Sequence, residues 1–121
     1  MEPNNREFRR FKVGHLENLK GFLEGINTPL QLVTFGGGGC GFYGSNRVPQ
    51  LSPPKRVFCV FSMGTEPIKV QGNLLYVREV ETADRKIIFY GVEFIKPHRP
   101  HVEPLVSTLE KLKIEGLVEE S

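Results

Sequence analysis

The segment from Ile68 to Val80 carries apolar residues at even positions and polar residues at several odd ones, and this alternation constrains the fold more than any other feature. Period two is the pattern of a β-strand with one buried face. A polar turn follows at 81–86, and then a second apolar run at 87–95. The two runs predict an antiparallel hairpin with the even residues of its first strand buried. Those residues are Ile68, Val70, Leu74, Tyr76 and Val80.

Other apolar runs predict that most of the chain is β-structure. The runs at 30–35 and 57–61 have the length and composition of strands, and residues 40–43 are compatible with a resumed strand after a group of glycines. Residues 16–26 fit either a helix or a strand, because glycines interrupt their helical spacing. Residues 45–56 read as a loop, since they contain three prolines.

The period of the pattern changes near the C-terminus. Val102, Leu105 and Leu109 recur at helical spacing, which predicts an amphipathic helix at about 102–113. A chain of 121 residues has the length of one domain. Several antiparallel strands followed by one helix predict a mainly β fold, a small barrel or sandwich whose open end the helix covers.

Six of the thirteen glycines lie within positions 36–44, and four of them are consecutive. Glycine has no side chain to pack and loses more backbone entropy on folding than other residues, so the cluster indicates a place that requires bare backbone. Three interpretations stay open: a flexible hinge, a tight bulge between strands, or a surface whose N–H groups approach a ligand such as a phosphate. A P-loop is excluded, because no Lys-Ser or Lys-Thr pair follows.

The first twelve residues form a basic arm in which Arg6 and Arg10 are four positions apart, with Arg9 between them. Guanidinium donates in a fork that fits a phosphate or the O6 and N7 atoms of guanine, so the two outer arginines are candidates for binding one ligand. A solvated arm without a ligand is the competing interpretation. Because the net charge is only +2, we expect no nucleic acid polymer as a partner.

Several classes of site find no support in the sequence. Cys40 and Cys59 have no metal-ligand spacing and are expected to be buried free thiols. His98 and His101 lack a third ligand group, so we expect no metal site, and no nucleophile and base can be paired by their spacing. No apolar run has the length of a membrane span. We therefore expect a cytoplasmic binding protein without a cofactor, not an enzyme and not inserted in a membrane.

The Arg6-x-x-x-Arg10 arm, a strand entering a glycine-rich turn, the strand containing Tyr-Gly-Val-Glu-Phe and the closing helix together resemble the PilZ family, from Arg6 to Lys113. The resemblance implies a six-stranded antiparallel β-barrel with a C-terminal helix. It implies a basic arm at 1–12, one barrel domain at 13–116 with its helix at about 102–113, and a tail at 117–121. Many PilZ domains are bacterial receptors for the second messenger cyclic di-GMP, bound through RxxxR and a downstream [D/N]xSxxG.

The family motifs carry over onto this chain in part. Arg6 and Arg10 match RxxxR, and Arg9 is an additional basic residue inside it. In the second motif Gly39 matches the final glycine, whereas Thr34 stands in place of the acid or amide and Gly36 in place of the serine. Loss of both polar contacts would weaken nucleotide binding by roughly ten- to ten-thousand-fold.

Two functions follow from the resemblance. In the first, the protein is a receptor that binds cyclic di-GMP through Arg6, Arg9, Arg10, Thr34, Gly36 and Gly39 and relays the signal to an unidentified protein partner. In the second, it is a degenerate PilZ-like module that binds a protein partner and has weak or no affinity for the nucleotide.

Overall fold

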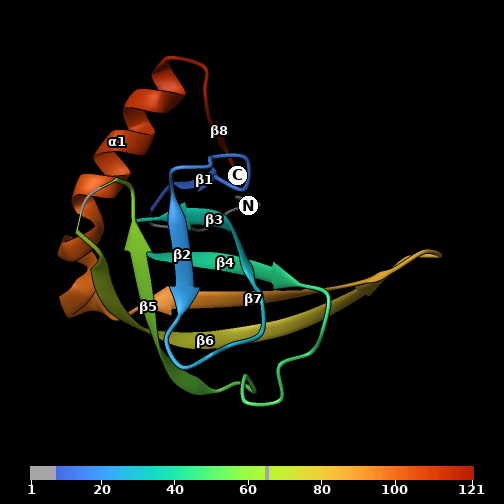
Figure 1. Ribbon diagram of the computed structural model, residues 1–121. Coiled ribbons are helices and arrows are strands. Elements are labelled where there is room, and N and C mark those ends of the chain that lie inside the picture. The colour runs from blue at the N-terminus through green and yellow to red at the C-terminus, as the bar shows by residue number, and fades with distance from the viewer. Residues whose placement is uncertain (1–7, 65) are drawn as a thin grey trace, which may run out of the picture.

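The computed structural model describes residues 8–64 and 66–121, and their strands form one antiparallel sheet in the order β2-β5-β6-β7-β4-β3-β1-β8 (Figure 1). The strands are β1 (Arg10–Lys12), β2 (Lys20–Leu23), β3 (Gln31–Gly36), β4 (Gly39–Gly44), β5 (Lys55–Ser62), β6 (Ile68–Glu81), β7 (Lys86–Phe94) and β8 (Glu119–Glu120). A 3-10 helix, η1 (Lys96–Val102), leads into the helix α1 (Glu103–Ile114). The prediction of a mainly β, antiparallel fold with a C-terminal helix is confirmed.

The sheet has two strands more than the six expected, and both are short. β1 is formed by the last three residues of the segment assigned to the arm, and it pairs with β3 on one side and β8 on the other. β8 comes from the segment assigned to the tail. The two ends of the described chain therefore join the same edge of the sheet. Residues 16–26, left open as helix or strand, contain β2.

The sheet curls around an aromatic core to which the inner faces of most strands contribute. Phe35 and Phe61 meet edge to face with ring centroids 4.8 Å apart, and Phe94 lies 5.7 Å from Phe61. The helix α1 lies beside the strand ends and buries Leu105 and Leu109 (Figure 1). This core holds the curved sheet together, because burying a large apolar side chain stabilises a fold by about 1.5–3 kcal/mol.

The two cysteines lie in this core as buried free thiols, as the sequence predicts. Burial raises the pKa of the Cys40 thiol well above its usual range, and the neighbouring Cys59 adds to the shift. A thiol in such surroundings stays protonated and unreactive at neutral pH. Cys40 is therefore not a candidate for nucleophilic chemistry.

The long hairpin of β6 and β7 extends past the other strands, and here one prediction was wrong (Figure 1). The even residues of β6 are buried only as far as Leu74. The pairing with β7 shifts between Leu74 and Tyr76, and beyond that irregularity Tyr76 is 44% exposed and Val80 40% exposed. The irregularity adds Leu75 to β6 and exchanges its two faces: Tyr76 pairs with Gly91 on the outer face, and Val77 pairs with the buried Tyr90 and packs against the core.

Candidate functional site

The glycines of β3, β4 and β7 give the outer face of the sheet a strip without side chains. Gly39 and Gly41 alternate along β4 with Cys40 and Phe42, which are buried in the core, so the two glycines face outward. Gly91 of β7 is the cross-strand partner of Gly41. We call Gly36, Gly39, Gly41 and Gly91 the glycine strip. It lets side chains from neighbouring strands lie flat against the backbone.

Arg10 is the first such side chain. It is the cross-strand partner of Gly36, and its Nη2 lies 2.6 Å from the point that a Cβ on Gly39 would occupy. The Cα of Glu93 lies 3.3 Å from the same point. The second arginine of RxxxR and the last glycine of the second motif are thus in contact, although they are far apart in the sequence.

Thr34 and Gly36 occupy the positions where the sequence departs from the family motif. The Oγ1 of Thr34 lies 2.7 Å from the point that a Cβ on Gly41 would occupy, so its hydroxyl borders the strip. A Cβ on Gly36 would collide with the carbonyl oxygen of Arg9. The backbone leading into β1 therefore fills the space in which a serine side chain would stand.

Arg9 is placed differently from Arg10. Its guanidinium lies 3.7 Å from a carboxylate oxygen of Glu110 on α1 and 3.7 Å from one of Glu120 on β8, and its side chain is 59% exposed. Arg9 is thus balanced by two acidic groups at the helix and β8, whereas Arg10 lies on the strip. Arg6 lies outside the described residues.

The turn between β3 and β4 shows a further use of the glycine run. Ring carbons of Phe8 lie 2.9 Å and 2.8 Å from the points that Cβ atoms on Gly37 and Gly38 would occupy, so only glycine admits the ring there. The guanidinium of Arg99 in η1 stacks over this ring, 5.2 Å from its centroid. The run is therefore a tight turn covered by an aromatic residue of the arm rather than a hinge.

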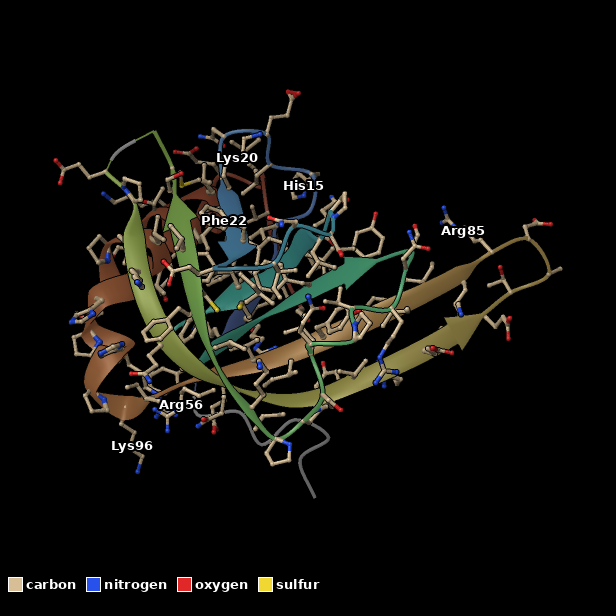
Figure 2. All side chains as sticks on the ribbon, turned by 60° about the horizontal axis from the view of Figure 1, so that its bottom comes forward. His15, Lys20, Phe22, Arg56, Arg85 and Lys96 are labelled. Carbon is tan, nitrogen blue, oxygen red and sulfur yellow. The ribbon has the colours of Figure 1, made fainter. Side chains whose placement is uncertain are left out.

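The strip also borders polar residues that the sequence analysis missed. Glu93 is the cross-strand partner of both Gly39 and Asn73, so these three residues lie in one row across β4, β7 and β6. The Nε of Arg56 on β5, labelled in Figure 2, donates a 2.8 Å hydrogen bond to Asn73 Oδ1. The ring of Tyr76 lies against Gly91. In the sequence, the one signal that could have identified Asn73 and Glu93 was their position on the outward face of the predicted hairpin.

Other candidate chemistry is limited in the described part of the chain. Within residues 8–64 and 66–121, no group of three or more His, Cys, Asp or Glu side chains could hold a metal ion. The Nδ1 of His98 instead accepts a 2.9 Å hydrogen bond from the backbone N–H of Gln71, and its ring stacks on His101. No helix of the described chain is both long enough and apolar enough to span a bilayer.

The architecture can now be compared with known proteins. No family model matches the sequence, and the curated proteins contain no significant match to it. Among solved structures, the chain is similar to the PilZ domain with c-di-GMP of YcgR from Escherichia coli, with a TM-score of 0.61. The fold is that of a PilZ domain. The similarity covers 94% of this chain and 92% of the YcgR domain at 16% sequence identity, so it extends over most of the chain.

Proposed function

We propose that this protein is a bacterial receptor of the PilZ type that binds cyclic di-GMP on the outer face of its sheet and relays the signal to a protein partner. The observation that carries the proposal is the contact of Arg10 with Gly39, which joins parts of both carried-over motifs. The fold shared with a PilZ domain that holds c-di-GMP supports it.

Each motif residue has a separate role in this proposal. Arg6 and Arg10 clamp the phosphates and the guanines, because charge-assisted bonds from guanidinium to phosphate are stronger than neutral ones. Thr34 supplies a hydroxyl at the border of the strip, and Gly36 and Gly39 let the arm approach the backbone. Arg9, whose guanidinium lies near Glu110 and Glu120, contacts the ligand at the edge of the clamp and contributes less to binding than the other two arginines. Docking of the arm and the nucleotide together on the sheet changes this surface, and this change is what the partner detects.

Calorimetric titration with cyclic di-GMP tests the proposal. We expect the wild-type protein to bind and Arg10→Ala to weaken binding by about tenfold or more, because it removes a charge-assisted contact. Arg85→Ala is the matched control, since it removes the same charge from the tip of the hairpin, far from the strip (Figure 2). A flat titration of the wild-type protein at high micromolar nucleotide would contradict the proposal.

That flat titration would favour the second function, a degenerate module that binds only a protein partner. One observation supports this alternative: the carbonyl of Arg9 fills the place of the motif serine, so one polar contact of the family pattern has no counterpart at that position. Under the alternative, the protein captures a partner from lysate equally well with and without added cyclic di-GMP. Under the receptor proposal, the nucleotide changes the amount captured.

A further inference from the structure

We propose that Glu93 and Asn73 recognise the guanine base, and so replace the Asp or Asn that position 34 lacks. This inference rests on the proposed function, since it specifies which part of the ligand these two residues contact. Neither residue belongs to the two motifs. Their assignment depends on the row that they form with Gly39 and on the polar atoms that they present.

The row brings the pair next to the proposed phosphate clamp. Gly39, Glu93 and Asn73 are successive cross-strand partners on β4, β7 and β6. Neighbouring strands are about 4.8 Å apart, so the row spans roughly 10 Å from Gly39 to Asn73, a length suited to one purine. Because Arg10 Nη2 lies over Gly39, the clamp is at one end of the row and the amide of Asn73 is at the other.

Hydrogen bonds set which atoms the pair presents. Asn73 Oδ1 accepts the bond from Arg56 Nε, so its amide nitrogen, a donor, is directed to the other side. Glu93 is half exposed, and its Oε2 lies 3.9 Å from Nη2 of Arg99. Arg99 is itself anchored, because its Nε donates a 3.3 Å bond to the carbonyl of Phe94 and its side chain is only 18% exposed. The row therefore presents a carboxylate acceptor beside an amide donor.

This arrangement matches the Watson–Crick edge of guanine. Guanine presents O6 as an acceptor and the N1 and N2 hydrogens as donors, so the Glu93 carboxylate accepts the two hydrogens while Asn73 donates to O6. Adenine presents an acceptor at N1, where the carboxylate has no hydrogen to offer, so adenine is rejected. A carboxylate beside Arg10 would weaken binding of a phosphate alone. Its presence therefore favours a ligand that combines phosphate with guanine.

The test uses two isosteric variants, Glu93→Gln and Asn73→Asp. Each is titrated with cyclic di-GMP, with cyclic di-AMP and with the inosine analogue of cyclic di-GMP. The inosine analogue lacks the N2 amino group. We expect Glu93→Gln to weaken cyclic di-GMP binding by about tenfold or more, with cyclic di-AMP unaffected or bound better. Asn73→Asp should weaken cyclic di-GMP similarly, because it places a carboxylate opposite O6. The inosine analogue should bind more weakly than cyclic di-GMP to the wild-type protein, and this difference should shrink in Glu93→Gln.

Glu79→Gln is the control, because it removes the same charge from the projecting half of β6, where Glu79 faces Arg47. It should leave all three affinities unchanged, and circular dichroism should show native melting for every variant. Wild-type protein that binds cyclic di-GMP while Glu93→Gln retains its affinity and its preference over cyclic di-AMP would overturn this inference alone. Wild-type protein that binds no cyclic di-GMP would overturn the proposed function and the inference with it.

Discussion

The two halves of the β6–β7 hairpin are both antiparallel pairs, and the register shift between Leu74 and Tyr76 separates them. At the base, Leu74 is buried in the core, while Asn73 and Glu93 border the glycine strip on the outer face. Toward the tip, residues 78–81 of β6 are exposed, although Ile88 and Tyr90 on the facing strand β7 are still buried. The tip is held by cross-strand contacts such as Arg78 over Phe89, 5.9 Å from the ring centroid.

The difference shows that a strand can be predicted from its own residues, whereas the burial of its side chains depends on the other strands beside it. Apolar residues recur at even positions in both halves, yet β5 pairs with β6 only as far as Leu74, and the irregularity that follows turns the even positions to the outer face. The candidate site exists at the base because β1, β3 and β4 bring Arg10 and Gly39 there. Three expected outcomes test this comparison: stability at the base against the tip, the packing of the glycine strip that the base borders, and the ion pair at the edge strand β8.

The largest expected effect is on stability at two even positions of β6. Leu74→Ala should lower the free energy of unfolding by about 2–5 kcal/mol, because Leu74 is fully buried and the change leaves a cavity. Val80→Ala at the tip should change it by less than about 0.5 kcal/mol, because Val80 is substantially exposed. Urea denaturation followed by circular dichroism measures both. Equal losses of unfolding free energy would mean that Val80 is buried in solution, and they would contradict the difference between the base and the tip.

A smaller effect is expected from the close packing of the glycine strip. A Cβ at Gly39 would meet the carbonyl oxygen of Val92, so Gly39→Ala should cost about 1–3 kcal/mol of stability and displace Arg10. At Gly14 the nearest atom to a new Cβ is 3.4 Å away, which is an ordinary contact. Gly14→Ala is therefore the control and should be nearly neutral. A Gly39→Ala protein with wild-type stability would show that the strip is loosely packed.

The smallest effect concerns an ion pair at the opposite edge of the sheet from β2. A hydrogen bond from Lys113 Nζ to Oε1 of Glu120, 2.6 Å long, lowers the pKa of that carboxyl below its usual range. A depressed folded-state pKa adds stability above the unfolded pKa, and this stability is lost as the pH falls through the folded value. The effect is small, because the pair is exposed.

Nuclear magnetic resonance titration of the Glu120 carboxyl checks this prediction. Lys113→Ala should return its pKa toward the usual range, whereas Lys111→Ala, which removes the same charge two residues earlier on the helix, should not. An unchanged titration in Lys113→Ala would show that the edge strand β8 is not held by this pair in solution.

The periodic parts of the fold were predictable from the sequence. The alternation at 68–80 and the run at 87–95 correspond to β6 and β7, and the helix expected at 102–113 spans Glu103–Ile114. The short strands were not predictable. β1 and β8 consist of three and two residues, too few to show a period, and each is a strand only because it lies beside another strand.

The candidate site was predictable to the extent that it depends on sequence motifs. Arg10, Thr34, Gly36 and Gly39 were named from the family pattern and lie together on one face. Glu93 and Asn73 were not named as site residues: Glu93 lies in the Tyr-Gly-Val-Glu-Phe strand that supports the resemblance, but neither residue belongs to the two ligand motifs. Their importance comes from cross-strand registers with Gly39, which bring together residues far apart in the chain.

The sequence by itself determined that the runs at 68–80 and 87–95 form a hairpin, where the helix lies and where bare backbone is required, because these depend on period and on glycine. Only the tertiary structure decided which half of the hairpin is buried, why position 36 has no room for a serine, and which polar side chains border Arg10. The physical reason is that burial and hydrogen-bond geometry depend on neighbours supplied by other strands. Local sequence does not record those neighbours.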